Sequence, residues 1–252
     1  MDSLILAAGY ATRLRPLTDE RPKHLLPVGG RPMLDWVLDK LLEARVDDVH
    51  LVTNARFAAQ FEEWAEGKDV HVHDDGTMSN GDRLGAIGDV RFVQERAQLD
   101  DDLLVIAGDN LFDYSLADFV DFRRAKGGSA VAVHDVGDLE LVRKYSIVEL
   151  DADDRIVGFV EKPEHPTTTL AATAAYLYTR EHARLVGTYL EEGNPPDQPG
   201  NYVAWLHRRA PVYGYRFRGD WYDIGDAHQL LEADNRMRAR AGLPVRDTYL
   251  LD

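Results

Sequence analysis

A loop near the start of the chain gathers positive charge behind a predicted strand. The sequence SLILAAG (3–9) predicts a buried strand ending at Gly9, and the loop that follows carries Arg13 and Lys23. A guanidinium is a planar fork for phosphate oxygens and an ammonium is a mobile point charge, while loop N–H groups can cradle an anion. The loop contains neither G-x-x-x-x-G-K-S/T nor G-x-G-x-x-G. Taken alone, it is better explained as a solvated basic loop than as a phosphate site.

Two aspartates stand where a metal ligand is expected. The apolar run DLLVIAGD (102–109) delivers Asp109 at its end, and DWYDIGD (220–226) holds Asp223 just before the last predicted helix. A carboxylate at such a position is a natural ligand for Mg²⁺. An aspartate that caps a turn gives the same pattern. Asp226 is explained more simply as the N-cap of the helix.

A third candidate pair, Glu161 and Lys162, ends a predicted strand just before a proline. Neighbours on a strand face opposite ways. Both side chains therefore reach one site only if the strand ends or twists there. Taken alone, the pair is better explained as an exposed ion pair.

These stretches lie at strand ends in a regular strand–helix alternation. The alternation predicts an α/β protein with a doubly wound, mostly parallel sheet flanked by helices, and ligands bind such sheets beyond the carboxyl ends of the strands. Strands are predicted at 3–9, 48–54, 69–74, 102–109, 129–136, 146–151, 155–162, 169–179 and within 212–225. Helices are predicted at 33–44, 55–67, 85–96, 115–127, 180–192, 201–209 and 226–242. The second half is therefore the richer in strands.

Length and composition exclude several classes of protein. The chain has 252 residues, 44% of them hydrophobic, and a net charge of -15. Because nucleic-acid binding needs a basic face, we expect no nucleic-acid partner. No apolar stretch approaches the roughly 18 residues of a membrane span, and the N-terminus lacks the basic region of a secretory signal. With no cysteine for disulfides, we expect a cytoplasmic protein that uses no membrane.

The opening stretch also carries a long motif. LAAGYATRLRPLT (6–18) and PKHLLPV (22–28) match L-A-A-G-x-G-T-R-L-x-P-L-T followed by P-K-x-L-x-P-V. The chain thereby resembles the sugar-phosphate nucleotidyltransferases, in particular the short glucose-1-phosphate thymidylyl- and uridylyltransferases. AGDN, YSIVELD, EKP and WYDIG recur in the family's order. The resemblance implies one Rossmann-like domain over 1–252, with a nucleotide-binding half to about residue 110 and a strand-rich sugar-phosphate-binding half after it.

The resemblance also implies a reaction and a set of site residues. A sugar 1-phosphate, with glucose 1-phosphate favoured, would attack the α-phosphate of a nucleoside triphosphate, with dTTP or UTP favoured, and Mg²⁺ would assist. The implied catalytic residues are Arg13, Lys23, Asp109 and Lys162. The implied nucleotide-binding residues are Leu6, Ala8, Gly9, Arg13, Lys23, Asn80 and Gly85. The implied sugar-phosphate-binding residues are Tyr145, Ser146, Glu161, Lys162 and Tyr176. The implied metal ligands are Asp109 and Asp223.

Two departures from the family pattern bear on function. Ala11 stands where the family has glycine, and its methyl group disfavours a positive φ. SNGDRLGAIGD (79–89) stands at the base-reading segment and lacks the usual L-G-T-A-x-A, which leaves the nucleobase open. A non-catalytic nucleotide or sugar-phosphate sensor of the same fold is the alternative, although such a binder would be expected to lose some of the charged residues. A glycosyltransferase would need a D-x-D motif, and here Asn110 and Leu111 follow Asp109. Pairing of strands across subunits, giving a homo-oligomer, is left open.

Overall fold

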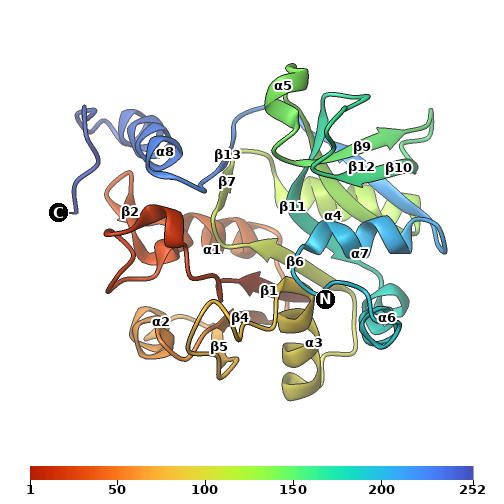
Figure 1. Ribbon diagram of the computed structural model, residues 1–252, viewed down its shortest axis with the longest axis horizontal. Coiled ribbons are helices and arrows are strands. Elements are labelled where there is room, and N and C mark those ends of the chain that lie inside the picture. Colours follow the sequence, from red (N-terminus) through yellow and green to blue (C-terminus); the bar gives the residue numbers. More distant parts are fainter. Residues whose placement is uncertain (252) are drawn as a thin grey trace.

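A large sheet forms the centre of the protein (Figure 1). The structure is a computed structural model, and it describes residues 1–251. The strands are β1 (Asp2–Leu6), β4 (Val49–Thr53), β5 (His71–Asp74), β6 (Leu103–Ala107), β8 (Ser129–Asp135), β9 (Ser146–Leu150), β10 (Ile156–Glu161), β11 (Leu170–Tyr178) and β12 (Val212–Arg216). Within the described residues they form one nine-stranded sheet in the order β10-β9-β11-β6-β1-β4-β5, and β8 pairs with β11 and β12. The mixed, mostly parallel α/β architecture predicted from the sequence is confirmed.

Helices cover both faces of the sheet, and β1 shows why. Successive side chains of a strand point to opposite faces, so Leu4 and Ile5 enter different cores. The core of Ile5 contains side chains from α1 (Met33–Glu43), α2 (Ala58–Ala65), α4 (Leu116–Lys126) and α8 (Ala227–Arg240). The core of Leu4 contains side chains from α3 (Ala86–Ala97), α6 (Arg180–Glu191) and α7 (Pro199–Leu206). The apolar runs of the parallel strands are thus buried on both faces, as parallel sheets require.

Strand β11 joins the parallel part of the sheet to the antiparallel part. Its residues 175–178 pair with β6, and Ala171 meets β9, while β8 pairs with both 170–172 and 176–177. The register shifts between Ala172 and Tyr176, and Ala174 between them has a φ of 54°. A bulge of this kind bends a strand. One continuous strand therefore serves both halves of the protein.

Short elements complete the structure near the ends of the main strands. The pair β7 (Asn110–Phe112) and β13 (Trp221–Asp223) forms a small sheet, as does the pair β2 (Pro27–Val28) and β3 (Arg31–Pro32). The stretch 212–225 thus gives two strands in different sheets, with Gly219 at a φ of 120° between them. The helix expected at 201–209 is α7, which starts earlier because Pro199 suits a first helical turn. The helix α5 (Leu139–Val142), capped by Asp138, was not predicted.

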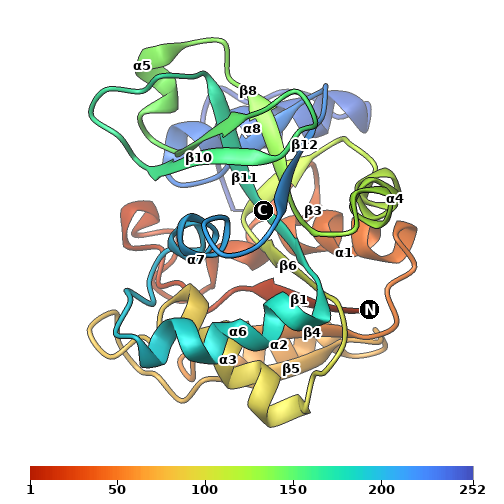
Figure 2. The same cartoon turned by 90° about the vertical axis from the view of Figure 1, so that its right-hand side faces the viewer.

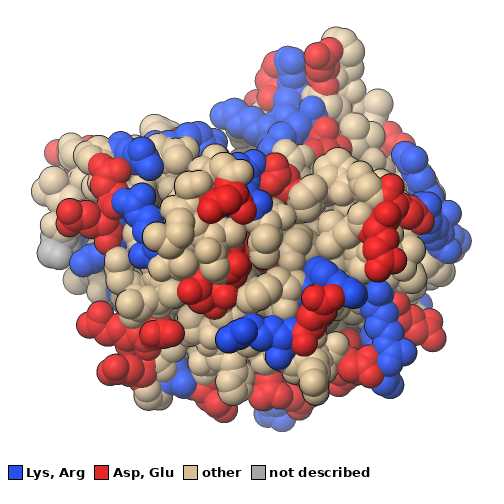
Figure 3. All heavy atoms as spheres, turned by 60° about the horizontal axis from the view of Figure 1, so that its bottom comes forward, with Lys and Arg blue, Asp and Glu red and all other residues tan. Residues whose placement is uncertain are grey.

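Capping residues end several helices, among them the predicted N-cap Asp226, and charges of both signs are mixed on the surface (Figure 3). The Ser115 side chain accepts from the Asp118 N–H and Gly127 ends α4, while Asp226 caps α8 by accepting from Gln229. Acidic and basic side chains are interspersed over the face seen in Figure 3. No helix within residues 1–251 has the length and apolarity to cross a membrane.

Candidate active site

A cleft of about 780 Å³ lies at the carboxyl ends of the parallel strands. Its walls come from the loops after β1 and β6, from β9, β10 and β11, and from the start of α7. The arrangement of β10, β11 and α7 can be followed in Figure 2. Every site residue inferred from the sequence lines it: Leu6, Ala8, Gly9, Arg13, Lys23, Asn80, Gly85, Asp109, Tyr145, Ser146, Glu161, Lys162, Tyr176 and Asp223. The fold therefore brings together residues that lie as far apart in the chain as Leu6 and Asp223.

The loop after β1 presents a free cation. Ala11 adopts the left-handed conformation, with a φ of 44° and a ψ of 43°, and its carbonyl accepts a 3.0 Å hydrogen bond from the Thr18 hydroxyl. The short helix η1 (Thr12–Leu14) then buries Leu14 in the core and leaves Arg13 exposed at the cleft. Within residues 1–251 Arg13 makes no ion pair, so its guanidinium is available for an anion. Arg15 pairs with Asp19 away from the cleft.

The second cation of this loop is held by a carboxylate. Lys23 begins the short helix η2 (Lys23–Leu25), and its ammonium forms an ion pair with Asp109 and donates to the carbonyl of Ile224 at 3.0 Å. Burial would raise the pKa of Asp109, but the Lys23 ammonium outweighs it, and the pKa of this carboxyl lies below its usual range. The neighbouring His24 is fully buried, which lowers its pKa to about 3 and keeps its ring neutral.

Asp223 lies beside Asp109 because β13 pairs with β7, with Asp223 directly opposite Asn110. The Asn110 side-chain amide donates to Asp109 at 2.9 Å and to Asp223 at 3.3 Å, and its oxygen accepts from the Trp221 indole at 2.7 Å. Burial, together with the charge of Asp109, raises the pKa of Asp223 to about 6. The Lys23 ammonium and the Arg13 guanidinium act in the opposite direction on the pKa of Asp223, but burial and the charge of Asp109 outweigh them.

The described residues contain no group of three His, Cys, Asp or Glu side chains able to hold a metal ion. Mg²⁺ is commonly bound through one or two carboxylates together with substrate phosphates and water. Asp109 and Asp223 fit that mode, because they supply oxygen ligands only and face the same cleft as Arg13. A metal held here would need oxygen atoms from the substrate.

Glu161 and Lys162 reach the cleft together because β10 ends between them. Lys162 has a φ of 42°, so its side chain does not continue the alternation of the strand. Its ammonium lies 3.5 Å from Glu161, which also accepts from the Ser146 hydroxyl. Gly200, at the start of α7, faces this pair so closely that a Cβ there would lie 2.6 Å from an oxygen of each of Ser146 and Glu161. Any side chain at Gly200 would therefore displace the Ser146 and Glu161 side chains.

At the other end of the cleft, Gly85 begins α3 with a φ of 80°. A Cβ at Gly85 would come within 2.7 Å of the Pro196 carbonyl, which accepts from the Ile87 N–H at 2.8 Å. Arg83 forms an ion pair with Asp197 at 2.8 Å. These contacts attach the loop before α3 to the loop before α7, and they close this end of the cleft.

Sequence reasoning missed several residues that line the cleft. They include Arg83, Asp89, Lys144, Asp197, Gln198 and Gln229. Arg83 and Asp197 are 114 positions apart, and nothing local in the sequence signals their pairing. The sequence does single out Asp89, because it is an acid four residues before Val93 and therefore lies on the buried face of a helix.

The fold and the cleft define an α/β protein that sets cations and paired carboxylates at the carboxyl ends of its strands, a site suited to phosphate groups. The family model described as nucleotidyl transferase matches residues 2–240. The chain belongs to this family.

Named relatives and solved structures agree with this assignment. The chain is 27% identical over 98% of its length to the bifunctional protein GlmU of Methanocaldococcus jannaschii, and 29% identical over 92% to a UTP–glucose-1-phosphate uridylyltransferase of Synechocystis. It spans 56% and 62% of the lengths of these two proteins. A Bacillus anthracis protein assigned as a glucose-1-phosphate thymidylyltransferase has a similar structure, with a TM-score of 0.80 and 25% identity over 94% of this chain and 95% of that one.

Proposed function

We propose that this protein transfers a nucleotidyl group from a nucleoside triphosphate to a sugar 1-phosphate and releases pyrophosphate. UTP or dTTP and glucose 1-phosphate are the favoured substrates. The observation that carries the proposal is the convergence of Arg13, Lys23, Asp109, Asp223 and Lys162 on one cleft. A sensor would need cations to bind phosphates, but it would not need three cations and two carboxylates that face one another.

The proposed reaction is a displacement at the α-phosphorus. A phosphate oxygen of the sugar 1-phosphate forms a new bond to that phosphorus, and the bond to the bridging oxygen breaks, leaving its electron pair on pyrophosphate. Such transfers depend mainly on positioning and on stabilisation of charge. Arg13, exposed and without an ion pair among the described residues, would neutralise the β- and γ-phosphates. Gly9 and the backbone around it would hold the triphosphate.

Lys23 would stabilise charge at the reacting phosphates. In the absence of substrate its ammonium is held by Asp109 and the Ile224 carbonyl, so it is already positioned at the cleft floor. Asp109 and Asp223 would hold Mg²⁺, which when bound would supply further positive charge at the α-phosphate. The Asn110 amide, fixed by Trp221, would keep the two carboxylates in place.

The far wall would bind the sugar 1-phosphate. Lys162 would bind its phosphate, and Glu161, oriented by Ser146, would accept hydrogen bonds from sugar hydroxyls. Tyr176 is buried behind them, and the Tyr145 ring packs 4.9 Å from Trp221. In this proposal residues 1–252 act as one cytoplasmic unit, in which about 1–110 bind the nucleotide and the remainder the sugar phosphate.

Pyrophosphate release tests the proposal. UTP, dTTP, GTP, CTP and ATP would each be combined with several sugar 1-phosphates, with Mg²⁺ and again with EDTA. We expect release with at least one pair and its loss in EDTA. Release from no pair, with nucleotide still bound, would favour the sensor, and full activity in EDTA would remove the metal from the site.

A further inference from the structure

A buried acid faces the end of the cleft that Asn80 and Gly85 line. Asp89 lies in the first turn of α3, is 6% exposed and lines the cleft. It occupies the last position of LGAIGD (84–89), where the family pattern has alanine. A carboxyl group buried at a ligand cleft requires a partner that offsets its desolvation.

That partner is a second aspartate. Asp75 lies just after β5, and its side chain and that of Asp89 lie within hydrogen-bond reach of each other. Asp75 Oδ2 and Asp89 Oδ1 are both buried and would both lack a donor if both groups were ionised. One proton shared between the two carboxyl groups satisfies both oxygens. The pair therefore carries one proton and one negative charge.

The surrounding donors show where the proton lies. Asp75 Oδ1 accepts from the Thr77 N–H at 2.7 Å and from the Thr77 hydroxyl at 2.8 Å. The Tyr10 hydroxyl lies 3.1 Å from the same Thr77 hydroxyl, so these donors all point toward Asp75. Asp89 accepts no hydrogen bond from the residues of 1–251, and burial followed by the charge of Asp75 raises the pKa of Asp89 to about 8. Asp75 is thus the anion, and Asp89 is the acid that donates to it.

This assignment fixes what Asp89 offers to the cleft. The buried Oδ1 of Asp89 has no other partner among the described residues and carries the hydrogen bond to Asp75, so Oδ2 is the carbonyl-type oxygen left to serve the cleft that Asp89 lines. An oxygen of this kind accepts hydrogen bonds. The negative charge on Asp75 behind it repels phosphates, which places the triphosphate tail at the Arg13 and Lys23 end. The group beside Asp89 must be neutral and must offer an N–H or O–H.

We propose that Asp89 reads the base of the nucleotide by accepting a hydrogen bond from a ring N–H. At the ring position, uracil and thymine carry such an N–H at N3 and guanine carries one at N1, whereas cytosine and adenine present an acceptor nitrogen there and carry their N–H donors on the exocyclic amino group. Two acceptors facing each other leave both unpaired, which is costly in a buried site. Asp89 is therefore the specificity-determining residue and Asp75 positions it. This proposal rests on the proposed function, since it assumes that a nucleotide occupies the cleft.

The experiment compares UTP with CTP, which differ only at the edge that Asp89 would read. Binding of each is measured by calorimetry, and turnover by pyrophosphate release, for the full chain and three variants. For the unchanged protein we expect UTP to bind about tenfold or more tightly than CTP. Asp89→Ala should bring that ratio close to one. Asp89→Asn should preserve it, because the amide can donate to Asp75 while its oxygen faces the cleft.

Two controls keep the test decisive. Glu95→Ala lies on the same helix, exposed and paired only with Arg91, and should leave the ratio unchanged. UTP methylated at N3 should bind the unchanged protein about tenfold more weakly than UTP, which tests the contact even if Asp89→Ala does not fold. An unchanged UTP/CTP ratio in folded Asp89→Ala, or equal binding of the methylated nucleotide, would overturn the proposal. Preferential UTP binding without any pyrophosphate release would instead overturn the transferase activity and leave the base reading intact.

Discussion

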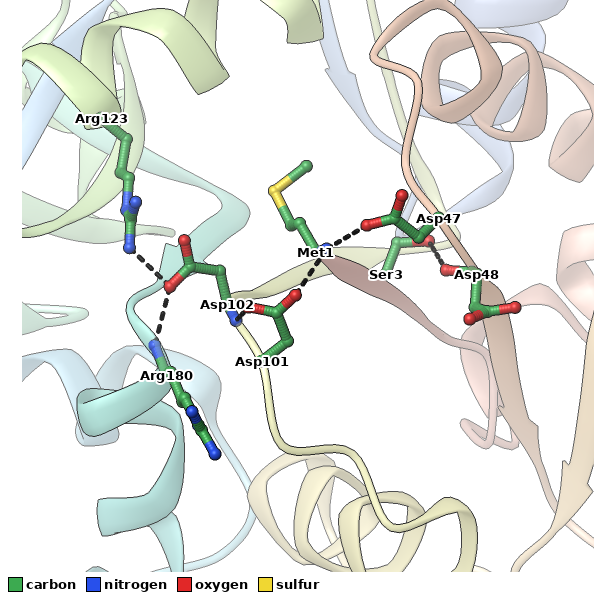
Figure 4. A network of polar contacts seen from close by, with 8 residues as sticks. All are labelled: Met1, Ser3, Asp47, Asp48, Asp101, Asp102, Arg123 and Arg180. Atoms are coloured by element: carbon green, nitrogen blue, oxygen red, sulfur yellow. Dashed lines mark hydrogen bonds and ion pairs between the residues drawn. The ribbon is translucent and has the colours of Figure 1, made fainter.

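Charged side chains at the two ends of the parallel strands differ in how completely they are paired. At the amino end, shown in Figure 4, Asp102 accepts from the Arg123 guanidinium at 2.7 Å and from the backbone N–H of Arg180 at 2.8 Å. The amine of Met1 lies in the same network, between Asp47 and Asp101. At the carboxyl end, Arg13 forms no direct ion pair in residues 1–251, and Asp223 lies beside another carboxylate.

The difference separates what holds the fold from what serves the substrates. Charges at the amino end satisfy one another and tie β6, α4 and α6 together. Charges at the cleft are only partly compensated, and this end also contains left-handed Ala11, Lys162 and Ala174. Strain and unpaired charge of this kind are typical of functional sites. Changes at the cleft should therefore alter activity, and changes at the amino end should alter stability.

The largest effect is expected at Lys23. Lys23→Ala should lower turnover by roughly 10²–10⁴, because it removes a charged contact to the reacting phosphates. Arg15→Ala, in the same loop but paired with Asp19, should stay within about twofold because it lies outside the cleft. Pyrophosphate release measures both. Equal losses in the two variants would show that the loop acts only through its overall charge.

The Asp75–Asp89 pair should make the cleft end sensitive to pH. The folded pKa of Asp89, about 8, lies above its unfolded value of 3.8, so the unfolded chain releases this proton first and stability falls as pH rises between the two values. Asp89→Asn keeps a neutral group and removes this dependence. Its advantage over the unchanged protein should grow by roughly 3–4 kcal/mol from pH 5 to pH 8. Urea unfolding checks this, and parallel stability curves would contradict it.

Breaking the amino-end network should cost stability and spare activity. Arg123→Ala removes a partly buried partner of Asp102, whose remaining donor is the Arg180 N–H, and should lower the free energy of unfolding by about 1–2 kcal/mol. Arg124→Ala, on the same helix but paired at the surface with Asp121, should change it by less than about 0.5 kcal/mol. A tenfold loss of turnover in Arg123→Ala would break the separation of the two ends.

The smallest effect concerns Ala11. A left-handed conformation costs a non-glycine residue about 1–2 kcal/mol, and glycine would remove this cost. Part of the stabilisation is lost again because glycine gives the unfolded chain more conformational entropy. Ala11→Gly should therefore raise the free energy of unfolding by roughly 0.5–1 kcal/mol. Ala125→Gly, exposed near the end of α4, should lower it by a similar amount. Destabilisation in both variants would mean that Ala11 is not strained.

Much of the fold could be predicted because it depends on local sequence patterns. The apolar runs at 3–9 and 102–109 indicated buried strands, which the structure has as β1 and β6. The caps at Ser115 and Asp226 follow from side chains that accept hydrogen bonds from nearby backbone N–H groups. The bend of β11 could not be predicted. It depends on a positive φ at Ala174, in a strand that pairs with β6, β8 and β9. An alanine in the sequence does not indicate a positive φ.

The site divides in the same way. Strand ends indicated Asp109 and Asp223, and the placement of Lys162 turned on whether β10 ends there, which the sequence left open. The pairing of Asp75 with Asp89 could not be predicted from the sequence. It arises only when the end of β5 packs beside the first turn of α3, and an acid in either position has an ordinary surface explanation until burial is known.

The bent strand β11 limits how this protein can be re-engineered. A recombinant that joins residues 1–110 of one relative to the remainder of another would place a foreign strand against β6, at the four positions where Ala175 to Tyr178 pair with it. The apolar side chains on both faces of that seam would then have to fit helices from two parents. Exchange of sugar preference between relatives should therefore succeed through the loops that end β9 and β10 rather than by cutting the chain near its middle.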